Sequence, residues 1–358
     1  MDSFAELGPL VRDAARWRSL GALFSLAAAC ALAGVLVACG GGGGGDAPAP
    51  SPAPSPAPAP SPSPAPTPIA AQLTVPTPVG YDTERLAAFN RLNEIRVSAG
   101  LGMLAQNTEM DQAAQAHAEW MIANDSFTHD EVTGTPGFTG VNWARRDEAF
   151  GYVPVEGGEV MAQGPGSVAV DALVNAAYHR AILLAFEPVD VGIGWSNGKS
   201  ASITTPLVID TTKPGLDAVR GLGQSTQPSI HGIAVWPLDG ARNVPTRLGL
   251  ETPNPVPTQD VSTLGTPVSV TVEESKTLSV ARFTLTNSTT GAVVATQLLT
   301  SANDPNGALP HSFIAAIPLA PLSANTTYQA VFSGSTVAFG SGNVEEVSRS
   351  WTITTGAQ

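Results

Sequence analysis

Apolar residues recur at the spacing of an α-helix in several stretches after residue 80. The clearest stretch covers residues 81–99, where Leu86, Phe89, Leu92 and Ile95 lie three residues apart. Asp82 and Thr83 are residue types that begin helices, and glycines follow the stretch. The same pattern predicts helices at residues 108–123, at 141–150, and at 168–184 with a break near Tyr178 and His179.

Alternating apolar positions predict strands after these helices. Residues 189–195 and 206–210 alternate in this way and are expected to pair. Residues 134–166 are rich in glycine and proline, so loops are expected there apart from the short helix. Helices followed by paired strands indicate an α+β fold.

The composition changes after about Pro214, where glycine, serine, threonine and proline dominate and helical periodicity ends. Short strand candidates separated by turn signals predict an all-β sandwich in this part. The candidates are residues 233–236, 268–272, 281–285, 293–296, 311–314, 327–332 and 350–353.

The N-terminal part has the pattern of an export signal. Residues 20–38 are apolar or small and follow three arginines, as in a secretory signal, although the run is also long enough for a transmembrane helix. The run ends in Leu36-Val37-Ala38-Cys39, which resembles the bacterial lipobox, and this favours cleavage with lipid attached to Cys39. We therefore assign 1–39 to a lipoprotein signal peptide. Residues 40–79, first Gly-rich and then rich in Pro, Ala and Ser, are expected to form an extended tether.

Charge and cysteine content narrow the class of protein. The formal charge of −13 argues against a nucleic-acid partner, which needs a basic face. Both cysteines, Cys30 and Cys39, lie in the signal segment, so no disulfide is expected in the exported part.

The candidate site consists of two histidines that bracket a carboxylate. His129 and His179 lie on either side of Glu159, in a chain with five histidines. Two imidazoles and a carboxylate match a zinc shell with one open position, with His129 and His179 as the metal ligands. The alternative is a hydrogen-bonded polar cleft in which Glu159 fixes the imidazole tautomers. His117 is expected to be a packing residue on the second helix.

The first folded part resembles the CAP superfamily, that is, the SCP domain of cysteine-rich secretory, venom-antigen and pathogenesis-related proteins, in its bacterial form. The resemblance covers about residues 81–212. It rests on these segments: Phe89-Asn90-Arg91-Leu92-Asn93, Ala114-Gln115-Ala116-His117-Ala118, Ser126-Phe127-Thr128-His129, Gly158-Glu159, His179-Arg180-Ala181-Ile182-Leu183 and Val191-Gly192-Ile193-Gly194.

The resemblance implies a three-layer α-β-α sandwich over residues 80–213. It also implies a cleft lined by His129, Glu159 and His179 that holds a divalent metal in some members. This chain departs from the family pattern because the helix before His179 lacks a second acid and Tyr178 replaces a glycine. Residues 231–358, after a linker at 214–230, resemble the Ig-like sandwich often appended to bacterial CAP domains.

These observations predict an exported protein, held by lipid at the outer membrane or cell surface, that works as a binding or interaction module. Its expected partners are the membrane, through Cys39, and a small ligand, lipid or envelope protein. The predicted cofactor is zinc or another divalent metal. The alternative is a metal-assisted hydrolase or peptidase of the cell envelope.

Overall fold

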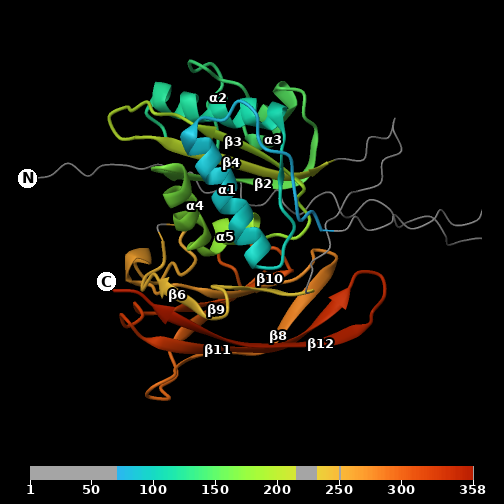
Figure 1. Cartoon of the computed structure of the whole chain (residues 1–358), viewed down its shortest axis with the longest axis vertical. Coiled ribbons are helices and arrows are strands. Elements are labelled where there is room, and N and C mark those ends of the chain that lie inside the picture. The colour runs from blue at the N-terminus through green and yellow to red at the C-terminus, as the bar shows by residue number, and fades with distance from the viewer. Residues whose placement is uncertain (1–70, 215–231, 250, 358) are drawn as a thin grey trace, which may run out of the picture. The chain divides into compact units, whose positions relative to one another are not determined.

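The computed structural model describes residues 71–214, 232–249 and 251–357 (Figure 1). The signal segment, most of the tether and nearly all of the linker, on which the sequence predictions fall, lie outside these ranges. In the described part of the chain, no helix is long and apolar enough to cross a membrane.

Four strands form the sheet of the first folded part, in the order β1-β3-β4-β2. Strands β3 (Asp190–Trp195) and β4 (Pro206–Pro214) pair antiparallel, as predicted. The short strand β1 (Ala105–Gln106) lies parallel to β3. Strand β2 (Pro154–Gln163) pairs with β4 and places Glu159 opposite Asp210. The prediction of loops at this position was wrong, because pairing with β4 outweighs the low strand propensity of Gly157 and Gly158.

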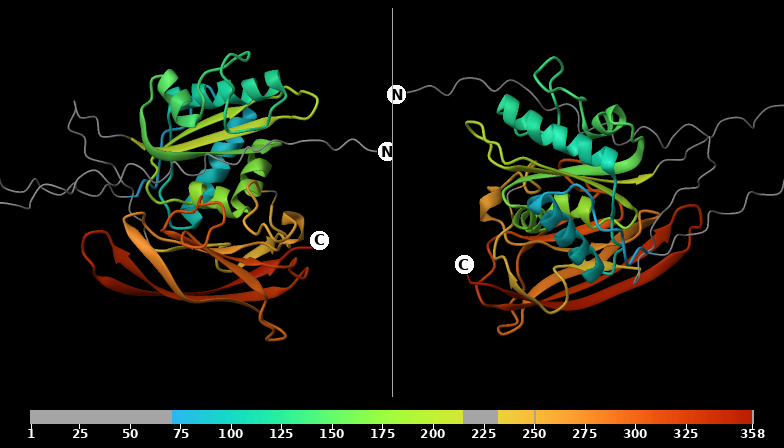
Figure 2. Two further views of the ribbon diagram at one scale, coloured as in Figure 1. Left: turned by 180° about the vertical axis from the view of Figure 1, so that it is seen from behind. Right: turned by 45° about the horizontal axis from the view of Figure 1, so that its top comes forward.

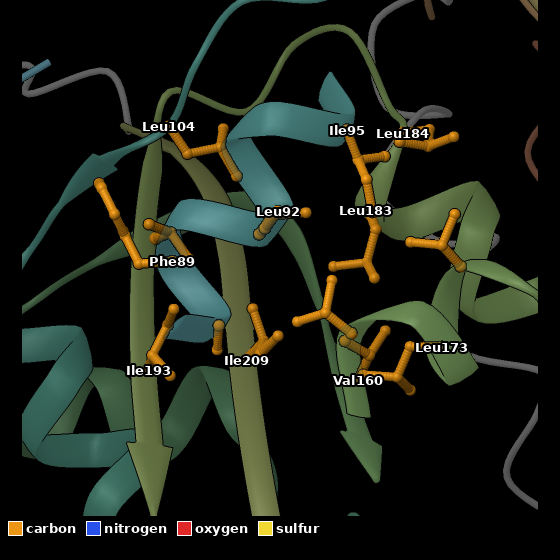
Figure 3. Close-up of a cluster of buried hydrophobic side chains, with 14 of the residues drawn as sticks. Phe89, Leu92, Ile95, Leu104, Val160, Leu173, Leu183, Leu184, Ile193 and Ile209 are labelled. Atoms are coloured by element: carbon orange, nitrogen blue, oxygen red, sulfur yellow. The ribbon is translucent and has the colours of Figure 1, made fainter. Parts of the chain in front are cut away.

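Helices cover both faces of this sheet, which gives the three layers expected from the resemblance (Figure 2). Helices α1 (Thr83–Ser98), α4 (Gly166–Val174) and α5 (Ala177–Leu183) lie on one face. Side chains of α1 and α4 pack there on Val160, Ile193 and Ile209 (Figure 3). The predicted long third helix is therefore two helices. They separate at Asn175 and Ala176, slightly before the predicted break.

Helices α2 (Thr108–Asn124) and α3 (Trp143–Ala149) cover the other face, where Ala114, Ala118 and Met121 pack on Met161 and Val208. Glycines of β3 allow α2 to lie directly on the sheet. A Cβ on Gly194 would lie 2.2 Å from the backbone of Ala114, so any larger residue would push α2 away. All three predicted helices in this region, at 81–99, 108–123 and 141–150, are confirmed.

The second folded part contains two four-stranded sheets, ordered β5-β7-β10-β9 and β6-β12-β11-β8. Buried side chains of both sheets, such as Val270, Ile314, Phe332 and Trp351, form a shared core, so a two-sheet sandwich is confirmed. Strand β6 was not predicted, and the strand expected at 293–296 begins only at Thr296. The strands are β5 (Ala234–Trp236), β6 (Ala241–Val244), β7 (Val268–Thr271), β8 (Lys276–Asn287), β9 (Thr296–Thr300), β10 (Phe313–Pro318), β11 (Thr327–Ala338) and β12 (Val344–Thr355).

The two folded parts share buried surface within one compact unit. Ala177, Tyr178 and Ala181 of α5 belong to the same apolar cluster as Leu248 and Phe313 of the second part. Arg180 is fully buried and donates to the carbonyl oxygen of Pro267 at 2.9 Å and to Ser269 Oγ at 3.1 Å. The second part therefore completes the burial of α5.

Candidate functional site

Glu159 lies at the centre of the candidate site. Strand alternation directs its side chain towards α2 and α3, because the neighbouring Val160 faces α1. One carboxylate oxygen is 2.8 Å from His129 Nδ1, and the other accepts from Arg146 Nη2 at 2.5 Å. The Glu159 side chain is 1% exposed and that of His129 is 48% exposed. Glu159 therefore orients a half-exposed imidazole from below the surface.

His117 links this carboxylate to a second one. Its Nδ1 is 3.0 Å from Glu131 Oε1, and its Nε2 is 3.0 Å from the carbonyl oxygen of Thr128 and 3.9 Å from Glu159 Oε1. Glu131 also accepts from the backbone N–H groups of Thr139 and Gly140. Both ring nitrogens of His117 therefore face oxygen atoms of the surrounding chain. This arrangement fixes the loop that carries His129.

Two further acids lie in the same layer. Asp147 of α3 and Asp210 of β4 are fully buried, and none of their four carboxyl oxygens has a hydrogen-bond partner. Together with four residues described above they form what we call the buried polar cluster. Its members are His117, Glu131, Arg146, Asp147, Glu159 and Asp210, each at most 5% exposed.

The carboxyl groups of the cluster fall into two kinds, because the pKa is lowered for Glu159 and Glu131 and raised for Asp147 and Asp210. Burial alone would raise the pKa of Glu159, but the charges of Arg146 and His117 and the His129 contact lower the pKa to about 2. Burial likewise opposes ionisation of Glu131, whose pKa is nevertheless lowered by the bonds from His117, Thr139 and Gly140. Burial and the charge of Glu159 raise the pKa of Asp147 to about 7, and the same two causes raise the pKa of Asp210 well above its ordinary value.

His179 has a different partner from the one predicted. Its Nδ1 is 3.4 Å from Oε1 of Glu251, a buried carboxylate of the second folded part. The same carboxylate accepts from the backbone N–H groups of Ala177 at 2.8 Å, Tyr178 at 2.5 Å and His179 at 3.3 Å. Helix α5 has no side-chain cap of its own, so Glu251 satisfies its first N–H groups. Tyr178 donates its hydroxyl hydrogen to Asp304 and is turned towards the second part as well.

The residues present do not fit a metal shell of His129, Glu159 and His179. Both oxygens of Glu159 are engaged, one by a guanidinium, and His179 lies against a different carboxylate. In the residues that the structure describes, no group of three or more His, Cys, Asp and Glu side chains is arranged to hold a metal ion. The polar-cleft interpretation describes the His129–Glu159 contact better.

Sequence reasoning missed most of the cluster. Arg146, Asp147 and Glu131 follow no motif, and His117 was predicted to be a packing residue although it contacts both Glu131 and Glu159. The sequence did contain one indication of the cluster. Asp210 ends an otherwise apolar predicted strand, and acids are seldom buried in such a strand unless they have a partner. Asp304 of the second folded part accepts backbone N–H bonds from its own turn.

A shallow hollow of about 250 Å³ lies elsewhere, along α2. Its lining includes Arg85, Asp111, Gln115 and Phe150 but none of His129, Glu159 and His179. The polar groups of Asp111 are already engaged by Tyr81, Gln106 and the N–H of Ile193. The hollow therefore adds no reactive group to the candidate site.

One family model matches a segment of the first folded part. Residues 89–205 match the family model described as CAP: Cysteine-rich secretory protein family. We call residues 89–205 the CAP segment. It contains His117, His129, Glu159 and His179, whereas Glu251 lies outside it. No curated protein matches the chain.

Two solved structures show limited similarity to the chain. An extracellular protein containing a SCP domain from Bacillus anthracis str. Ames is 22% identical, with 36% of this chain and 40% of that one covered and a TM-score of 0.31. This chain thus spans less than half the length of the Bacillus protein. An outer surface protein from Borrelia burgdorferi is 19% identical, with 36% of this chain and 90% of that one covered and a TM-score of 0.30.

Proposed function

We propose that the chain is an exported lipoprotein whose CAP segment is a binding or interaction module rather than a metal-dependent hydrolase. The observation that supports this proposal is the engagement of Glu159. Its ion pair with Arg146 holds the pKa near 2, so Glu159 is a weak base and has no free oxygen with which to activate water. His129 is then a half-exposed polar side chain that a ligand at the surface can contact.

The C-terminal sandwich, which we propose to be Ig-like, supports the CAP segment in this role. It supplies Glu251 to α5 and shares an apolar cluster with it. A module that presents a fixed surface to a small ligand, lipid or envelope protein benefits from such support, because an ordered site loses less entropy on binding.

A metal and substrate screen tests this proposal against the enzyme alternative. We expect zinc per purified chain, after dialysis, to be substoichiometric and equal in the wild type and in His129→Ala/His179→Ala. Peptide and ester hydrolysis should likewise be unchanged by His129→Ala. One zinc per wild-type chain that the double variant loses, or turnover that depends on His129, would establish the metal-assisted hydrolase instead.

Lipid anchoring is tested with the two cysteines of the signal segment. We expect Cys39→Ser to abolish incorporation of labelled palmitate in a bacterial host and to shift the protein out of the membrane fraction. Cys30→Ser is the matched control and should retain both the label and the membrane fraction. Label that survives Cys39→Ser but disappears with Cys30→Ser would move the anchor to Cys30.

A further inference from the structure

The buried polar cluster contains more acid than its cations neutralise. Its guanidinium, Arg146, already contacts Glu159 and lies 4.0 Å from Glu131, and His117 already contacts Glu131. Asp147 and Asp210 have no donor for any of their four oxygens. A carboxylate that is buried without a donor is held far more easily in its neutral form.

The neighbours of Asp210 in the sheet are an acid and a glycine. Across one side of the strand its partner is Glu159 of β2, and across the other side it is Gly192 of β3, which has no side chain. Helix α3 contributes Arg146 and Asp147, helix α2 contributes His117, and the loop between these helices contributes Glu131 and His129. Three acids, Glu159, Asp147 and Asp210, thus lie around the one guanidinium of the buried polar cluster.

We propose that Asp147 and Asp210 are held protonated in the folded chain and form a pH-sensitive lock under His129, closed while both carry their protons and weakened when either loses it. Ionisation of either acid adds a negative charge beside Glu159 and competes with it for Arg146. The elements joined by Arg146, namely α3, strand β2 and the loop that carries His129, then lose stability together. This inference concerns the fold beneath His129 and holds whether or not His129 binds a ligand.

The direction of the pH effect follows from the raised pKa values. An unfolded Asp titrates near 3.9, so between that pH and the folded value the folded chain binds more protons than the unfolded chain. The contribution of Asp147 and Asp210 to the free energy of unfolding is therefore largest at low pH, and it falls as the pH rises through their folded pKa values. For Asp147, with a pKa of about 7, most of the loss is complete by pH 8.

The test is urea unfolding of the full chain between pH 6 and pH 8.5. We expect the unfolding constant of the wild type to rise at least ~10-fold over this range. Asp147→Asn should remove a factor of ~10 from that rise, and Asp210→Asn should remove a further part. The exposed acid Asp130 gives the control, because Asp130→Asn should keep the wild-type slope. A flat wild-type profile, or a slope unchanged in both variants, would overturn the proposal.

Carbon-13 NMR of the side-chain carboxyl groups tests the same proposal without a variant that could fail to fold. The Asp147 resonance should titrate near neutral pH, and the Glu159 resonance should not move above pH 4. An Asp147 carboxyl that is already ionised at pH 5 would exclude the lock. Neither result depends on zinc, hydrolysis or lipid attachment, so the lock and the proposed function can fail separately.

Discussion

Arg146→Leu is expected to lower the free energy of unfolding by about 3–5 kcal/mol, the usual cost of removing one partner of a buried ion pair. Arg146 Nη2 is 2.5 Å from Glu159 Oε2, and Nη1 donates to the carbonyl oxygen of His129 at 3.0 Å. Without the guanidinium, Glu159 remains as a buried charge beside two further acids. Urea unfolding of the variant and the wild type at pH 7 measures the loss.

The neighbouring Arg145 provides the control. Its side chain is 63% exposed and pairs with Glu148 at the surface, so Arg145→Leu should cost no more than about 1 kcal/mol. Because both residues lie in α3, a general effect of leucine on this helix would appear in both variants. Equal losses in the two variants would show that the buried ion pair contributes little.

Glu251→Ala is expected to destabilise the whole chain by about 2–4 kcal/mol, although Glu251 lies outside the CAP segment. The carboxylate accepts from three backbone N–H groups at the start of α5, and its side chain is fully buried. Alanine leaves these donors buried without an acceptor, because α5 has no other side-chain cap. Thermal and urea unfolding, followed by tryptophan fluorescence, measure the effect.

The control for this variant is Glu345→Ala in the same folded part. The Glu345 side chain is 66% exposed and pairs with Lys276 at 3.3 Å, so its loss should change stability by less than about 1 kcal/mol. A Glu251 variant as stable as this control, or one that unfolds only the second part, would show that the two parts are energetically independent.

The first prediction depends on a cluster that the sequence did not reveal, and the reason is geometric. Helix periodicity gave α1, α2 and α3 with nearly correct limits, because their apolar positions repeat locally. The cluster instead collects side chains from α2, the loop after it, α3, β2 and β4, over the range from His117 to Asp210. Such a set has no spacing that could be recognised along the chain.

The strand that carries Glu159, β2, also could not be predicted from the local sequence. Gly157 and Gly158 favour a loop locally, yet β2 pairs with β4 over its length. Gly158 also lies close to a helix, since a Cβ there would lie 3.1 Å from the side chain of Ile182 in α5. Gly158, which indicated a turn, therefore lies in a strand at a close approach to helix α5.

The sequence by itself determined the α+β class of the first part and the sandwich of the second, because helical period and strand alternation encode them. It grouped His129 with Glu159 but left open whether they form a metal shell or a polar cleft. The structure decided which groups surround Glu159. It added Arg146, His117, Asp147 and Asp210 to the site, and it placed His179 against Glu251. Charge and hydrogen-bond partners depend on distances of a few ångströms between remote segments, and only the folded chain sets those distances.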